Sequence, residues 1–132
     1  MLQDNTIPLP GRMTITVHTI GDTTIIAVAG ELDAAVADDL RRHLLAGVAS
    51  SSALIVDLTA VTFCSAGTLR ILLDVTGAAR SAGASCAMVS DHWIVLRAIT
   101  ACGFESRLAV HPTLGAALSW LSGEAPTIVL RA

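Results

Sequence analysis

Two short runs of β-branched and apolar residues open the patterned part of the chain. They are Thr14–His18 and Thr23–Ala29, and the dipeptide Gly21-Asp22 separates them. A two-residue connection that begins with glycine is typical of a tight β-hairpin. We therefore predict two antiparallel strands joined by this turn.

Apolar side chains then recur every four residues, which is the spacing of one face of an α-helix. They are Val36, Leu40, Leu44 and Val48. Asp33 stands directly before this segment and is a preferred residue type for the N-cap. The pattern predicts a helix over Ala34–Ala49, with Asp38 and Arg42 forming an i,i+4 ion pair on its solvent side.

A run of apolar, strand-forming residues follows at Ala53–Leu58. Its composition is typical of a central strand that is buried on both faces and parallel to a neighbour. After a short turn, we expect Ser65 to cap a second helix that runs to about Ala82. Apolar residues cover most of this helix. This apolar surface is larger than packing on one face of a sheet normally buries, so we expect part of it to stay exposed.

The last third of the chain continues the alternation of strand and helix. The predicted elements are a strand at Ser85–Val89, a helix capped by Asp91 and ending at Ala101, a weak edge strand at Arg107–Val110 and a helix at Thr113–Leu121. The whole pattern predicts an α/β fold, with one mixed, mostly parallel sheet of four to five strands and about four helices.

The length of 132 residues is that of one ordinary domain. We place this domain at residues 13–122. Residues 1–12 contain Pro8, Pro10 and Gly11 without any periodicity, so we expect a flexible N-terminal tail there, and a C-terminal tail at 123–132.

The composition excludes a disordered chain, because 53% of the residues are hydrophobic and 14% are charged. No apolar run approaches the roughly 20 residues of a membrane span, and the N-terminus has no signal-peptide pattern, so we expect a cytoplasmic protein. The basic residues are eight scattered arginines and the net charge is −3, so we do not expect nucleic-acid binding.

The residues that common enzyme mechanisms need are missing. Without any lysine the chain has no Walker A lysine, no kinase strand lysine and no Schiff-base nucleophile. Phe63 stands where the nucleophile elbow G-x-S-x-G would place its first glycine before Ser65. The three cysteines, at 64, 86 and 102, form no zinc or disulfide pattern. We therefore expect no enzymatic activity, no cofactor and no metal.

Ser65 is the residue on which a function is most easily built. It follows the central strand and begins a helix, and the backbone N–H groups and dipole of a helix N-terminus favour an anion. A phosphate on Ser65 would suit this place and would add close to two negative charges to the surface. The alternative is a purely structural N-cap, which is what most capping serines are.

Cys64 stands one residue before this helix, in the predicted loop. Thiols near helix N-termini have a lowered pKa, so oxidation of Cys64 to a sulfinic acid would be a conceivable redox control. The stronger expectation is that Cys64 packs inward as a small apolar residue.

Several segments, in their order along the chain, resemble the STAS domain family. Gly30-Glu31-Leu32-Asp33 resembles the G-E-L-D signature after a strand. Leu54–Leu58 with Ser65-Ala66-Gly67 resembles the central strand and the D-S-x-G segment, and Gly103-Phe104 resembles the end of the third helix. The resemblance covers about residues 13–122 and implies the STAS fold.

The resemblance also implies a function, that of an anti-sigma-factor antagonist. Such proteins bind an anti-sigma factor, a serine kinase of histidine-kinase-like ATPase fold, and are controlled by phosphorylation of the serine that Ser65 matches. The implied partner-binding residues are Glu31, Asp33, Asp57, Cys64, Ser65, Ala66, Gly67 and Thr68. The chain departs from the family where Cys64 replaces the aspartate that usually precedes the serine.

Two other classes of function are compatible with parts of the sequence. STAS subunits of a transport or stressosome-like assembly often lack the surroundings of the phosphoacceptor serine, which fits Cys64 in place of aspartate, whereas Ser65 itself favours the antagonist. A small enzyme of the flavodoxin or receiver type fits less well, because a receiver needs a lysine at a strand end. Whether the protein forms a homodimer is left open by the sequence.

Overall fold

The computed structural model describes residues 5–8 and 13–123. Six strands form one sheet in sequence order. They are β1 (Asn5–Pro8), β2 (Met13–Ile20), β3 (Thr23–Leu32), β4 (Ala53–Cys64), β5 (Ser85–Val89) and β6 (Val110–His111). The first two pairings, β1–β2 and β2–β3, are antiparallel, and the three from β3 to β6 are parallel, so the predicted mixed, mostly parallel sheet is confirmed.

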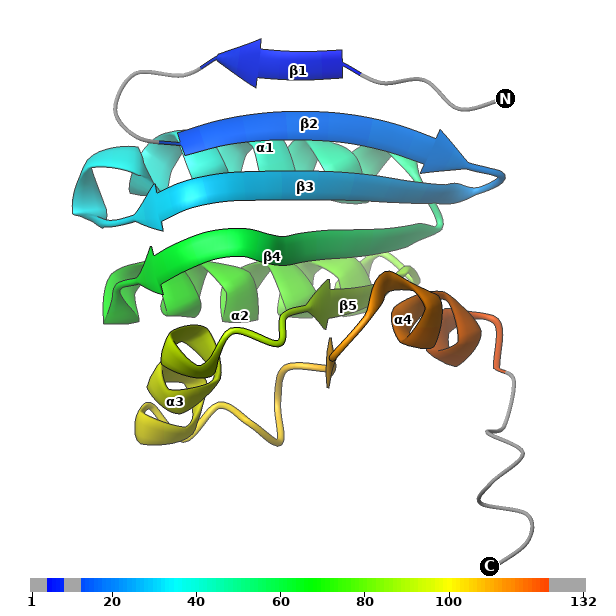
Figure 1. Ribbon diagram of the computed structural model, residues 1–132. Helices are drawn as coiled ribbons and strands as arrows, with labels where there is room; N and C mark the ends of the chain where they lie inside the picture. Colours follow the sequence, from blue (N-terminus) through cyan, green and yellow to red (C-terminus); the bar gives the residue numbers. More distant parts are fainter. Residues whose placement is uncertain (1–4, 9–12, 124–132) are drawn as a thin grey trace, which may run out of the picture.

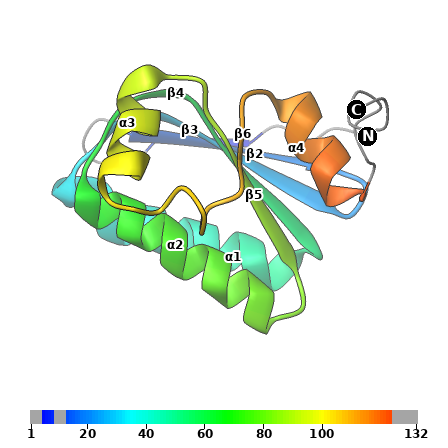
Figure 2. The same cartoon turned by 90° about the horizontal axis from the view of Figure 1, so that it is seen from below.

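Three α-helices and one short 3-10 helix connect the parallel strands, and a fourth α-helix follows β6. They are η1 (Ala34–Val36), α1 (Ala37–Ser50), α2 (Ala66–Ser81), α3 (Trp93–Ala101) and α4 (Leu114–Leu121). Figure 2 shows α1 and α2 side by side on one face of the sheet, with α4 on the opposite face. None of the helices within residues 13–123 is long and apolar enough to cross a membrane.

The main core lies between the sheet and the helices α1 and α2. It contains the four-residue stripe predicted for the first helix: Val36, Leu40, Leu44 and Val48. A second, smaller core lies on the other face, where Ala117 of α4 packs against Ile25, Ile55, Ala87 and Val89. Both faces of β4 are therefore covered, as the apolar run Ala53–Leu58 predicts.

The hairpin is present with the predicted two-residue turn. Ile20 pairs with Thr23, and Gly21 has a φ of 58°, which only glycine adopts without strain. The strands on either side are longer than predicted, because backbone pairing continues beyond the β-branched residues.

The N-terminal segment differs from its prediction. Asn5–Pro8 pairs antiparallel with β2 as an edge strand, whereas residues 1–12 were expected to form a tail without regular structure. This strand is the reason that the sheet has six strands instead of four to five. Residues 1–4, 9–12 and 124–132, which include most of the two predicted tails, lie outside the described part of the chain.

Three local predictions about polar residues and strand ends were wrong. His92, not Asp91, caps α3, where its Nδ1 accepts a hydrogen bond from Ile94 N at 3.2 Å. The last strand is Val110–His111 instead of Arg107–Val110.

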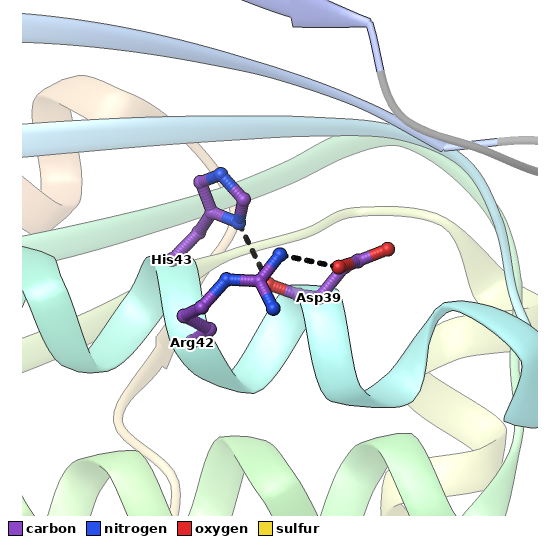
Figure 3. A network of polar contacts seen from close by, with 3 residues as sticks. All are labelled: Asp39, Arg42 and His43. Atoms are coloured by element: carbon purple, nitrogen blue, oxygen red, sulfur yellow. Dashed lines mark hydrogen bonds and ion pairs between the residues drawn. The ribbon is translucent and has the colours of Figure 1, made fainter.

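The third concerns Arg42, which pairs with Asp39 instead of Asp38. Its Nη2 lies 2.5 Å from Asp39 Oδ1, one i,i+3 step away on α1. Figure 3 shows Arg42 and His43 both turned toward Asp39, and His43 Nδ1 lies 2.8 Å from the Asp39 carbonyl oxygen. Asp39 thus contacts both Arg42 and His43. The i,i+4 spacing of Asp38 and Arg42 in the sequence did not indicate this pairing.

Candidate functional site

The candidate site lies where the parallel strands end. The carboxyl ends of β3, β4 and β5 meet at one edge of the sheet, and each is followed by a helix or 3-10 turn (Figure 1). Ser65 follows β4 at this edge, and Asp33 follows β3. Such edges are where open α/β sheets place their binding sites.

The last residues of β3 and the turn after it have the geometry that their residue types predict. Gly30 has a φ of 113°, which favours glycine, and the pairing of β3 with β4 shifts register between Gly30 and Glu31. Asp33 caps η1, because its Oδ1 accepts a hydrogen bond from Ala35 N at 3.0 Å. The predicted N-cap role of Asp33 is therefore confirmed, although the helix begins as a 3-10 turn before α1.

Ser65 is the N-cap of α2, as predicted. Its Oγ accepts a hydrogen bond from Thr68 N at 3.2 Å, and its own N–H donates to the Leu32 carbonyl at 2.8 Å. The second bond fastens the start of α2 to the end of β3. The residue is half-buried, so part of Ser65 is accessible at this edge of the sheet.

The first turn of α2 presents exposed backbone and no acidic side chain. Ala66 and Gly67 are both exposed. The first N–H groups of a helix have no partner inside the helix, and the dipole of the 16-residue α2 adds partial positive charge there. A phosphate on Ser65 would therefore be tolerated by the fold.

Two residues expected at the partner surface are buried instead. Thr68 is 0% exposed and Cys64 is 4% exposed. Cys64 is not in a loop, because β4 continues to it and ends there. These two side chains support Ser65 from inside and cannot touch a partner, which corrects their predicted role.

The chemistry of Cys64 follows from its burial. Burial is the largest influence on its thiol and raises the pKa. The hydrogen bond with Thr68 lowers the pKa, and the nearby charge of Cys102 raises it, so the pKa is raised overall. A buried thiol with a raised pKa is a poor nucleophile. The arrangement favours the structural role of Cys64 over the redox control considered from the sequence.

Asp57 lies away from Ser65. It stands seven residues before Cys64, the last residue of β4, roughly 23 Å away at the usual rise of a strand. The pairing of β4 with β3 shifts register directly after Asp57. Its Oδ1 accepts hydrogen bonds from the backbone N–H of Thr59, at 2.9 Å, and from the Thr59 hydroxyl. The strand does not end at Leu58 as predicted, because the bulge lets β4 continue to Cys64. Asp57 is therefore not beside Ser65, and its predicted contact with a partner stays a prediction.

The exposed apolar surface is also placed differently from the prediction. The apolar residues of α2 do not stay exposed: Leu69, Ile71, Leu72, Leu73 and Val75 are all buried in the main core. Phe63, near the end of β4, is 45% exposed, and Trp93, at the start of α3, is 65% exposed. Trp93 was not predicted as a site residue. The signal for it in the sequence is an aromatic residue that directly follows a helix cap after a strand.

Within residues 5–8 and 13–123, no group of three or more His, Cys, Asp or Glu side chains could hold a metal ion. The three cysteines are free thiols. The site therefore consists of a hydroxyl at a helix N-terminus, a capped turn beside it and exposed apolar side chains on the same edge of the sheet.

Comparisons with known proteins agree with one another on the family. The family model described as the STAS domain matches residues 14–117. The chain is 31% identical over 117 residues to the anti-sigma-F factor antagonist RsfA of Mycobacterium tuberculosis, covering 86% of this chain and 91% of that protein.

Solved structures agree with the fold. The crystal structure of an anti-sigma factor antagonist from Mycobacterium paratuberculosis is 28% identical with a TM-score of 0.75, covering 88% of this chain and 99% of that one. The anti-sigma factor antagonist SpoIIAA in its unphosphorylated form is 13% identical with a TM-score of 0.69, covering 85% of this chain and 99% of that one, and this likeness concerns the fold alone.

Proposed function

Because the chain belongs to the STAS domain family, we propose that it is an anti-sigma factor antagonist whose binding is controlled by phosphorylation of Ser65. Unphosphorylated protein binds an anti-sigma factor in the cytoplasm, and this binding releases a sigma factor for transcription. The anti-sigma factor is a serine kinase of histidine-kinase-like ATPase fold that phosphorylates Ser65. The named relatives that are antagonists of anti-sigma factors support the proposal.

The observation that carries the proposal is the position of the Ser65 hydroxyl. Ser65 is a half-buried residue at the N-terminus of a long helix, between the capped turn of Asp33 and the exposed residues Ala66 and Gly67. A partner that covers this edge of the sheet must contact Ser65. The same edge has room for a phosphate, because a Cβ added at Gly67 would meet nothing closer than Ser65 Oγ at 3.9 Å.

The control by phosphate follows from electrostatics. A phosphate adds close to two negative charges, which the helix N-terminus stabilises within the free protein. At the interface the same charges lose water without gaining a matched cation, and an unpaired buried charge is strongly unfavourable. Phosphorylation therefore weakens partner binding while it leaves the fold intact.

The first test is incubation with the cognate anti-sigma factor kinase and ATP, followed by intact mass spectrometry. We expect the wild-type protein to gain one phosphate and Ser65→Ala to gain none. An unmodified wild-type protein that still binds the kinase would contradict control by phosphorylation. An unmodified protein that binds no anti-sigma factor would favour the alternative, a STAS subunit of a transport or stressosome-like assembly.

The second test replaces the phosphate by a carboxylate. Ser65→Asp should weaken binding of the anti-sigma factor by at least about 1.4 kcal/mol, or tenfold, because a charge enters a desolvated contact. The matched control is Ser85→Asp, which adds the same charge at an exposed position where β5 begins, at the other edge of the sheet. Calorimetric titration should give equal affinities for Ser85→Asp and the wild type, and equal affinity for Ser65→Asp would count against this placement of the interface.

A further inference from the structure

The hydroxyl of Thr68 is fully buried and lies within hydrogen-bond distance of four groups. Its Oγ1 is 2.9 Å from the Leu32 carbonyl and 2.9 Å from the Ser65 carbonyl. It is also 3.1 Å from Ser65 Oγ and 3.1 Å from Cys64 Sγ. Each of these groups belongs to the end of β3 or to the junction between β4 and α2.

The roles of these contacts follow from counting hydrogens and lone pairs. A threonine hydroxyl has one hydrogen to donate and two lone pairs to accept with. The two carbonyl oxygens can only accept, so the single hydroxyl hydrogen of Thr68 is shared between the carbonyl oxygen of Leu32 and that of Ser65. In the two remaining contacts Thr68 Oγ1 is therefore the acceptor, and the Ser65 hydroxyl and the Cys64 thiol are the donors.

Thr68 thus contacts the Ser65 hydroxyl both as a hydrogen-bond donor and as an acceptor. The Thr68 N–H donates to Ser65 Oγ at 3.2 Å, and the Ser65 hydroxyl hydrogen is directed to Thr68 Oγ1. Together these bonds fix χ1 of Ser65 and leave one lone pair of Ser65 Oγ pointing away from Thr68. An N-cap alone needs only the first bond, so the second is not explained by capping.

We propose that Thr68 is the residue that positions the Ser65 hydroxyl for phosphoryl transfer, an inference that rests on the proposed function. In this transfer Ser65 Oγ forms a bond to the γ-phosphorus of ATP, and the bond from that phosphorus to the β–γ bridging oxygen breaks. ADP leaves, and the Ser65 proton passes from its contact with Thr68 to a base of the kinase. Orientation of a nucleophile in this way contributes strongly to rate.

The buried residues Cys64 and Thr68 act together beneath Ser65. Cys64 stands where the family places an aspartate next to the serine. The Cys64 thiol donates into the second lone pair of Thr68 Oγ1. This contact adds to the bonds that hold the Thr68 hydroxyl beneath Ser65.

The decisive variants are Thr68→Val and Thr68→Ser. Valine keeps the shape of the side chain and the backbone N–H that serves the cap, and it removes only the hydroxyl. The two carbonyls lose little, because Leu32 O still accepts from Ser65 N at 2.8 Å and Ser65 O from Leu69 N at 3.0 Å. Serine restores the hydroxyl without the methyl group and serves as the rescue variant.

The first measurement needs no partner. Three-bond NMR couplings of Ser65 should show one χ1 rotamer in the wild type and in Thr68→Ser, and averaging over rotamers in Thr68→Val. A single, unchanged rotamer in Thr68→Val would overturn the positioning role, whether or not a kinase modifies the protein.

The second measurement is the steady-state rate of Ser65 phosphorylation by the cognate kinase. For Thr68→Val we expect kcat to fall at least about tenfold, with the KM for this protein unchanged because Thr68 is 0% exposed and cannot contact the kinase. Thr68→Ser should recover kcat. A rise in KM at constant kcat would overturn the proposal, whereas a wild-type protein that no kinase modifies would refute the proposed function and leave the rotamer test standing.

Discussion

Cysteine is the side chain whose charge can change in mildly alkaline solution, because the chain contains neither lysine nor tyrosine. Burial raises the pKa of the Cys86 thiol from 9.0 to about 11, against a hydrogen bond from Thr76 that lowers it. The pKa of Cys64 is also raised by burial. In both cases the folded protein holds the neutral thiol more strongly than the unfolded chain does.

The sign of the pH dependence follows directly. A raised pKa in the folded state contributes stability that is complete below the unfolded value of 9.0 and is lost as the pH rises through about 11. We expect the free energy of unfolding to fall over this interval by on the order of 2–3 kcal/mol from Cys86. Urea unfolding under reducing conditions at several pH values measures the fall.

The control for this measurement is Cys86→Ala. Alanine leaves a small cavity and lowers the stability at every pH, but it removes the titrating group, so the fall with pH should become shallower. The double variant with Cys64→Ala should be shallower still. An equally steep fall in Cys86→Ala and the wild type would show that the thiols are not its source.

At the scale of single elements, α1 and α2 lie side by side but tolerate different changes. Gly47 of α1 faces the sheet, where an added Cβ would lie 2.8 Å from Ile26 Cδ1 and 3.1 Å from Leu54 Cδ1. Gly77 of α2 is exposed, and an added Cβ would meet nothing within 4 Å. The two positions therefore separate close packing from helix propensity.

We expect Gly77→Ala to stabilise the protein by roughly 0.5–1 kcal/mol, which is the propensity of alanine over glycine in a helix. Gly47→Ala gains the same propensity but must displace two fully packed side chains, which costs about 1–3 kcal/mol. Gly47→Ala should therefore be at least about 1 kcal/mol less stable than Gly77→Ala. Chemical denaturation of the two variants checks this, and equal stabilities would mean that the core beneath α1 yields easily.

The length of strand β4 decides where two of the predicted site residues, Asp57 and Cys64, lie. A turn after Leu58 would have placed Asp57 at the end of the strand and Cys64 in a loop. The bulge opposite Ala27 and Ala29 lets the strand continue, so that Asp57 lies mid-strand and Cys64 is covered. The Ser65 cap is unaffected, because it depends on the first turn of α2.

At the scale of the whole molecule, each of the two edges of the sheet has a large apolar side chain of similar exposure, and only one edge carries the candidate site. Phe63 is 45% exposed near the carboxyl end of β4, and Ile20 is 47% exposed in the hairpin at the other edge. These residues form a matched pair for locating the interface.

Phe63→Ser should weaken binding of the anti-sigma factor at least about tenfold, because a large apolar side chain buried at an interface contributes on the order of 1.4 kcal/mol or more. Ile20→Ser should bind like the wild type. Both side chains are half exposed, so both variants should keep nearly the stability of the wild type. The placement would be refuted if Ile20→Ser lost affinity and Phe63→Ser did not.

The sequence by itself determined the features that depend on neighbours a few residues apart. The turn at Gly21, the caps at Asp33 and Ser65 and the stripe of α1 all arise from interactions within one or two helical turns, so residue type and spacing suffice to predict them. The STAS order of strands and helices follows from the same local signals.

Only the tertiary structure decided which of these residues face a partner. Thr68 Oγ1 donates to the carbonyl of Leu32, 36 residues away, and this contact between β3 and α2 places Thr68 and Cys64 beneath Ser65. The core likewise covers the apolar residues of α2 that the pattern left exposed, and β1 pairs with β2 although its own sequence lacks a strand pattern. Burial and strand pairing depend on segments brought together by the fold, and no spacing along the chain records them.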